Sequence, residues 1–143
     1  MHFKHSPKDS PGLLLWQLCT IWSRKINQLL KQFNITHVQF VILANIKWLT
    51  LSKQLVTQVL IANLSKIDPV VISNVLKTLE SKQLVKRKTS KDTRFKEVKL
   101  TKEGLDLLAL AISEVETFDT DFFKDCPDLI SFNKGITSLL QSN

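Results

Sequence analysis

The segment from Asp68 to Gly104 constrains the fold of this 143-residue chain more than any other part, and it reads DPVVISNVLKTLESKQLVKRKTSKDTRFKEVKLTKEG. Asp68 and Pro69 are typical of a helix start. An aspartate side chain accepts hydrogen bonds from free backbone amides, and proline lacks the amide hydrogen that would stay unpaired there. Apolar positions at helical spacing follow. Apolar and basic residues then alternate over residues 84–88, and residues 98–100 repeat the pattern. The order predicts a short helix followed by a charged β-hairpin.

The region before this segment predicts three helices. Over residues 13–33, apolar side chains recur at spacings of three and four, which is typical of an amphipathic helix. Thr36 and Gln39 match a capping box, in which each side chain bonds the backbone amide of the other residue. A second helix is therefore expected from there to about Trp48, and after a polar bend a third over residues 57–66.

Beyond the hairpin, the pattern predicts two more helices. Thr101 is a suitable N-cap for a fifth helix, which Cys126 and Pro127 interrupt before a final apolar helix near the C-terminus. Residues 1–11 are polar, and we expect them to form a flexible tail. The predicted fold is a mainly α domain, residues 12–143, with a small β-hairpin.

Charge and composition favour a globular protein with a polyanionic partner. The chain carries a net charge of +7, is 43% hydrophobic, and contains only three glycines. Lysine and arginine bind nucleic acid partly because each neutralised phosphate releases counterions. The apolar run at residues 13–22 is shorter than the roughly 20 residues that cross a bilayer. We therefore expect no membrane association and a cytoplasmic protein.

Neither catalysis nor metal binding is expected. The three histidines and the two cysteines match no metal-ligand spacing, and no glycine-rich phosphate loop or nucleophile motif occurs. The sequence thus predicts no enzyme, cofactor or metal. Cys19 is interpreted as a packing residue rather than a redox sensor, and Trp16, Trp22 and Trp48 as packing residues rather than a ligand pocket. His37 is interpreted as a surface residue.

The third and fourth helices predict a helix-turn-helix. The buried stripe of the fourth helix leaves short polar, basic and small apolar side chains outward, as insertion into a DNA groove requires. The hairpin turn adds Lys91 and Arg94 at a positive tip, where Asp92 is expected to hold the turn. The candidate DNA-binding residues are Thr57, Gln58, Lys66, Val70, Val71, Ser73, Asn74, Lys77, Thr78, Lys91 and Arg94.

The chain resembles the MarR-type transcriptional regulators. The resemblance is carried by the runs FNITHVQFVIL and IANLSKIDPVVISNVLKTLESKQLVKR, by Asp92-Thr93-Arg94, and by VKLTKEG. It implies a winged helix-turn-helix core at about residues 36–100, with residues 68–82 as the recognition helix and Arg94 in the minor groove. It also implies dimerisation helices at about residues 13–33 and 101–141. Gln83 departs from the family, which generally has glycine there.

The resemblance implies a sequence-specific, DNA-binding regulator. We expect a homodimeric repressor that occupies a pseudo-palindromic site on double-stranded DNA and responds to a small-molecule effector, whose binding residues are unknown. The alternative is a helical dimeric adaptor for protein interactions, which would keep the fold without binding DNA.

Overall fold

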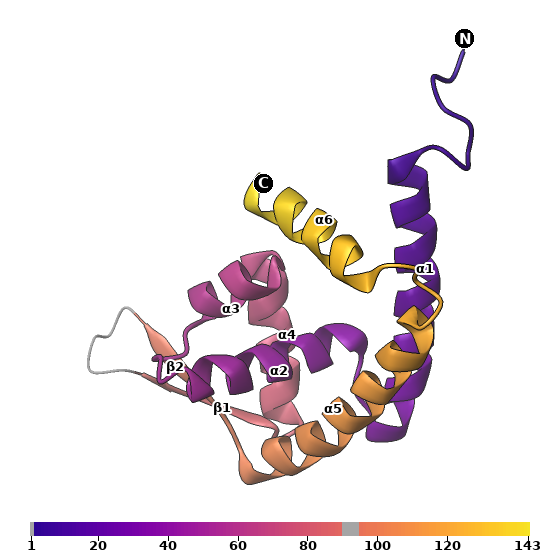
Figure 1. Cartoon of the computed structure of the whole chain (residues 1–143). Coiled ribbons are helices and arrows are strands. Elements are labelled where there is room, and N and C mark those ends of the chain that lie inside the picture. The colour runs from indigo at the N-terminus through magenta and orange to yellow at the C-terminus, as the bar shows by residue number, and fades with distance from the viewer. Residues whose placement is uncertain (1, 90–94) are drawn as a thin grey trace.

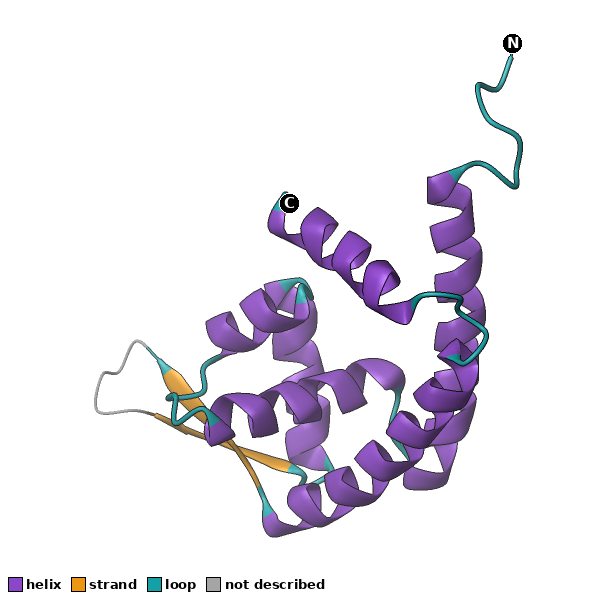
Figure 2. Cartoon of the chain, in the orientation of Figure 1, coloured by secondary structure: helices purple, strands orange, loops and turns teal. Residues whose placement is uncertain are grey.

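The computed structural model describes residues 2–89 and 95–143, and these residues form a helical protein with one hairpin (Figure 1). The element order is α1 (Pro11–Leu30), η1 (Lys31–Phe33), α2 (His37–Leu51), α3 (Gln58–Ser65), α4 (Pro69–Ser81), β1 (Val85–Thr89), β2 (Lys96–Leu100), α5 (Lys102–Phe123) and α6 (Leu129–Gln141). The elements α2, α3, α4, β1 and β2 form a winged lobe. Helices α1 and α5 lie side by side at the other end (Figure 2). The predicted mainly α fold with a β-hairpin is confirmed.

Side-chain caps start the helices at the predicted places. Thr36 accepts a hydrogen bond from the Gln39 amide at 3.2 Å, and the Gln39 side chain accepts one from the Thr36 amide at 3.1 Å. Asp68 accepts from the Val70 amide at 2.8 Å, and Thr101 from the Gly104 amide at 2.9 Å. These four contacts confirm the capping box of α2 and the N-caps of α4 and α5.

Two helix boundaries differ from the prediction. Helix α1 begins at Pro11, inside the predicted tail, because Ser10 caps the helix and proline suits its first position. Helix α2 continues to Leu51, into the bend predicted at residues 50–54, and the Thr50 hydroxyl donates to the Ile46 carbonyl at 2.7 Å. A threonine hydroxyl on a helix can donate its hydrogen bond to the carbonyl of the preceding turn. The polar residue Thr50 therefore did not end the helix.

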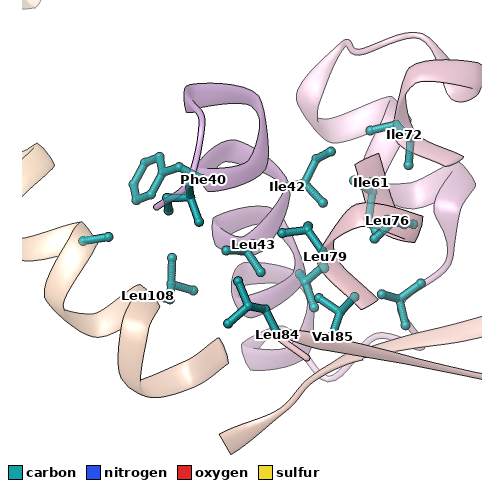
Figure 3. Close-up of a cluster of buried hydrophobic side chains, with 14 of the residues drawn as sticks. Phe40, Ile42, Leu43, Ile61, Ile72, Leu76, Leu79, Leu84, Val85 and Leu108 are labelled. Atoms are coloured by element: carbon teal, nitrogen blue, oxygen red, sulfur yellow. The ribbon is translucent and has the colours of Figure 1, made fainter. Parts of the chain in front are cut away.

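The winged lobe packs around an apolar core that continues into α1 and α5, as Leu108 shows (Figure 3). Helix α2 supplies three fully buried side chains, and the other elements each present one apolar face to it. Ile61 of α3 is fully buried, whereas its neighbour Val59 is 58% exposed. The lobe's fully buried large side chains are Ile42, Leu43, Ile46, Ile61, Ile72, Leu76, Leu79 and Val98.

The hairpin is fixed to the lobe by its inner face. Strands β1 and β2 pair antiparallel, with Val85 opposite Leu100 and Arg87 opposite Val98. The Val98 amide also donates to the Val56 carbonyl at 2.9 Å, just before α3. The wing, by which we mean β1 and β2, therefore has one face on the lobe and one in solvent.

A tight junction joins α4, the wing and α5. Gln83 adopts the left-handed conformation (φ 60°) at the position where the resemblance leads us to expect glycine, so the turn is made without glycine. The Thr101 amide donates to the Leu84 carbonyl at 3.1 Å, and the Thr101 hydroxyl to the Gln83 carbonyl at 2.7 Å. A Cβ placed on Gly104 would lie only 2.1 Å from the Leu84 carbonyl oxygen, so only glycine fits there.

Large apolar side chains of α1 and α6 remain exposed. Helix α6 stands away from the winged lobe in Figure 1, and none of its residues is buried. The exposed apolar residues on the two helices are Leu13, Leu14, Leu15, Trp16, Ile21, Leu129, Ile130, Ile136, Leu139 and Leu140. The prediction that Trp16, Trp48 and Cys19 are packing residues is wrong within this chain, since all three are exposed. For Trp22 the prediction is confirmed, since it is half-buried against the core. Helical spacing marks an apolar face but does not say what covers it.

Trp22 and His37 contribute a polar and aromatic contact where α1, α2 and α5 meet. The Trp22 indole N–H donates to Asp119 at 2.8 Å, and its ring meets the His37 ring edge-on at 4.9 Å. His37 is half-buried, which corrects its predicted surface position. Burial lowers the pKa of His37 from its usual value of 6.5, and the nearby Asp119 carboxylate opposes part of that shift.

Across residues 2–89 and 95–143, no single helix combines the length and the apolarity needed to cross a membrane. Helices α3 and α4 reach that apolarity only when taken together, and their axes are bent by 116°.

Candidate nucleic-acid interface

The turn between α3 and α4 is built by short side chains. Lys66 ends α3 in the left-handed conformation (φ 61°), and its amide donates to the Ala62 carbonyl. The Ser65 hydroxyl donates to the Ile61 carbonyl at 2.7 Å and accepts from the Ile67 amide at 3.2 Å. Asp68 then starts α4. The predicted helix-turn-helix is therefore present, with a bend of 116° between its helices.

Helix α4 has two distinct faces. Ile72, Leu76 and Leu79 are fully buried against the lobe. Val70 and Val71 are 68% and 42% exposed on the opposite side. The predicted residues Asn74, Lys77 and Thr78 are exposed as well, and Ser73 is half-buried at the edge of this face. We call Val70, Val71, Ser73, Asn74, Lys77 and Thr78 the outer face of α4.

Two of the three residues predicted at the ends of α3 are engaged within the protein. The Thr57 hydroxyl accepts from the Leu60 amide at 3.3 Å as the N-cap of α3. The side-chain oxygen of Gln58 accepts from Arg87 Nη1 at 3.3 Å. Lys66 is exposed at the turn. The remaining predicted residues, Lys91 and Arg94, lie outside the described residues, as does Asp92.

Arg87 is a central residue that the sequence interpretation did not single out. Its guanidinium forms an ion pair with Glu80, in the last turn of α4, and also bonds Gln58 in the first turn of α3. The Arg87 side chain is only 12% exposed. Strand alternation places Arg87 on the same face as the buried Val85, and this signal was available in the sequence.

The outer face of the wing is positively charged. Lys86, Lys88 and Lys99 are exposed, and Lys86 stands directly opposite Lys99 across the two strands. Glu97 lies 3.2 Å from Lys99 and offsets part of the charge. Like charges opposite each other in a sheet are destabilising, and a polyanion alongside them would remove that cost.

A hollow of about 380 Å³ lies between the start of α3 and the wing. Its lining residues are Thr57, Gln58, Val59, Phe95 and Lys96. Gln58 therefore both lines this hollow and bonds Arg87. Within the part of the chain that the structure describes, no group of three or more histidine, cysteine, aspartate or glutamate side chains could hold a metal ion.

Comparisons with known proteins extend over nearly the whole chain. The winged-helix domain family described as ArnR1-like matches residues 31–116. One relative, the uncharacterized HTH-type transcriptional regulator YdcH of Bacillus subtilis (strain 168), is 37% identical over 142 residues, which are 98% of this chain and 97% of the relative.

Solved structures share the fold at lower identity. The S. aureus MepR–DNA complex has a TM-score of 0.83 at 24% identity, over 96% of this chain and 99% of that one. CouR from Rhodococcus jostii RHA1, bound to p-coumaroyl-CoA, has a TM-score of 0.79 at 24% identity, over 97% of this chain and 94% of that one. Both likenesses agree with the arrangement of α1 to α6 described above.

Proposed function

This chain belongs to the MarR-type winged helix-turn-helix transcriptional regulators, and we propose that it acts as a homodimeric repressor. The family consists of DNA-binding regulators, not enzymes. In this proposal, the homodimer binds a pseudo-palindromic operator and dissociates from it when a small-molecule effector binds.

The observation that carries this proposal is the two-faced character of α4. One side is fully buried in the lobe, so the helix is rigidly held, and the other side presents short side chains to solvent. Short side chains let a helix approach base edges closely. Asn74 can bond adenine with both its donor and its acceptor, and the exposed valines can contact thymine methyl groups. Lys77 can reach a base or a phosphate.

The apolar surfaces of α1 and α6 support the homodimer. Contiguous exposed apolar residues mark contact sites, and a two-fold axis would let the same surface cover itself. Such a dimer would place two α4 helices in successive major grooves, about 34–36 Å apart. The resulting operator would be a pseudo-palindrome.

The small-molecule effector is supported by one relative and one hollow. CouR, which shares the fold, is bound to p-coumaroyl-CoA in its structure. In this chain a hollow of about 550 Å³ lies where α5 ends and α6 begins, a volume within the range of ligand pockets. An effector that favours one dimer geometry by about 1–3 kcal/mol would be sufficient to regulate DNA binding.

Selection of bound duplexes from a random DNA pool tests the proposal. We expect wild-type protein to enrich a site with two related halves, and we expect transcription from a promoter that carries this site to fall when the protein is added. Asn74→Ala should lose about 1–3 kcal/mol of discrimination at one position in each half-site. Gln28→Ala, which removes an exposed amide from α1, should leave the profile unchanged.

Two outcomes would contradict the proposal in different ways. Enrichment of no duplex at moderate salt would favour the adaptor alternative. An equal loss for Asn74→Ala on every sequence would mean that this residue only positions the protein on the backbone.

A further inference from the structure

We propose that Arg87 is a positioning residue that holds the side-chain oxygen of Gln58, so that Gln58 meets DNA through its NH₂ group. This inference rests on the proposed function, because it concerns how the helix-turn-helix meets a duplex. It goes beyond that function by stating which chemical group the start of α3 offers to the nucleic acid.

The first step is the burial and the bonding of Arg87. Its side chain is 12% exposed and reaches from the inner face of β1 to both helices of the helix-turn-helix. It pairs with Glu80 of α4 and donates to Gln58 of α3. A guanidinium with two anchors in two different helices has little freedom to swing out to a phosphate. The charge of Arg87 is therefore used inside the protein.

The second step is the direction of the Gln58 amide. Arginine carries five N–H donors and no acceptor, so only the oxygen of a glutamine amide can face it. The opposite orientation would place the NH₂ group against the guanidinium, with donors facing donors. Because Gln58 Oε1 lies 3.3 Å from Arg87 Nη1, the amide oxygen is directed toward the wing and the protein interior.

The third step is what remains available to a ligand. Gln58 is half-buried and also lines the hollow of about 380 Å³ that it shares with Lys96 and Phe95. With its oxygen held by Arg87, the group it can offer on that side is NH₂, two donors. A free glutamine reads adenine by donating and accepting together. Gln58 is instead suited to an acceptor alone, which is either a phosphate oxygen or the acceptor edge of guanine or thymine.

Gln58→Glu tests this directly, because it replaces the NH₂ group by oxygen at almost constant shape. The glutamate would pair with Arg87, so the melting temperature should stay at or above that of wild type. Its second oxygen would face an acceptor on the DNA, and affinity should fall by about tenfold to a hundredfold. Affinity equal to that of wild type, in a folded protein, would overturn the inference.

Arg87→Met is the complementary change, with Lys86→Met as its charge-matched control on the opposite face of the same strand. Without the hydrogen bond from Arg87, the Gln58 amide is free to rotate, and the group on the DNA that it can bond should change. If Gln58 faces a base, the pool selected by Arg87→Met should newly admit adenine at one position. If it faces a phosphate, affinity should fall about twofold to tenfold on all sequences with the salt slope unchanged, since no phosphate contact by a cation is lost.

Lys86→Met should instead lower the salt slope and leave the selected sequence as it is, because Lys86 is an exposed cation. Arg87→Lys keeps a donor near the Gln58 oxygen and should restore part of the wild-type behaviour. A folded Arg87→Met variant that keeps both the affinity and the profile of wild type would remove Arg87 from recognition. If wild type enriches no duplex, the proposed function fails together with this inference; if wild type binds and Gln58→Glu binds equally well, the inference alone fails.

Discussion

The winged lobe and the α1–α6 pair are both rich in leucine and isoleucine, yet they differ in what covers these residues. In the lobe, side chains from α2, α3, α4 and the wing bury one another, and eight large ones are fully inaccessible. In α6 no residue is buried, and Leu139 is 67% exposed. The lobe therefore completes its core within one chain, whereas the apolar surface of α1 and α6 is suited to a second copy.

The largest expected effect is the loss of a core side chain from the lobe. Leu76→Ala should lower the free energy of unfolding by about 2–5 kcal/mol, because Leu76 is fully buried and the cavity cannot collapse completely. Chemical denaturation measures this directly. The loss should be the same at low and at high protein concentration, since the lobe needs no partner. A loss below about 1 kcal/mol would show that the lobe core is loosely packed.

A charge in the α6 surface should act on association instead. Ile136→Asp is expected to raise the dissociation constant of the proposed dimer by about tenfold to a hundredfold, or about 1.4–2.8 kcal/mol, since an aspartate there would be desolvated. Sedimentation velocity at several concentrations measures the change. Ser142→Asp, which adds the same charge beyond the end of α6, is the matched control. An unchanged profile for Ile136→Asp would place the dimer interface elsewhere.

A smaller effect concerns the junction of the lobe with α5. Gln83→Gly should raise the free energy of unfolding by about 0.5–1 kcal/mol, because glycine adopts a positive φ without the clash that Gln83 accepts. Ser81→Gly, at the last residue of α4 where the backbone is still helical, should lower it by a similar amount. Thermal unfolding of the two variants tests whether the backbone is strained at Gln83. If both variants were destabilised, the strain at Gln83 would be negligible.

The smallest expected effect is a pH dependence at the boundary between the two regions. Because burial lowers the pKa of His37, the folded chain favours the neutral ring, and the unfolded chain binds a proton first as the pH falls. This contribution to stability is complete above about pH 6.5 and is lost at lower pH. His37→Phe should therefore flatten the fall in melting temperature between pH 7.5 and pH 5. His5→Phe, a change in the exposed N-terminal segment, should leave that fall as it is.

Local features of the sequence predicted most of the fold. Caps such as Thr36 with Gln39 depend on residues three positions apart, so helix starts were readable without tertiary information. The buried stripe of α4 followed from its spacing in the same way. Exposure was harder to predict, because periodicity identified the apolar face of α1 but not whether another molecule covers Trp16.

The candidate interface was predictable only in part. Outward residues of α4 such as Asn74 follow from helical spacing, which is a property of one element. The role of Arg87 depends on three elements that meet in space, and pairing it with Glu80 and Gln58 required coordinates. Which of the predicted residues contact DNA is still a prediction, including Lys91 and Arg94 outside the described residues.

The absence of a side chain at Gly104 has a mechanical consequence for the regulation of DNA binding. Because the first turn of α5 packs against the Leu84 carbonyl with no room for even a Cβ between them, we expect these two segments to move together. A rotation of α5 would thus carry the end of α4 and the base of the wing with it as one rigid piece. In a two-fold dimer, the angle between the α5 helices of the two subunits would then set the distance between their α4 helices. No flexible segment between α4 and α5 would absorb the motion.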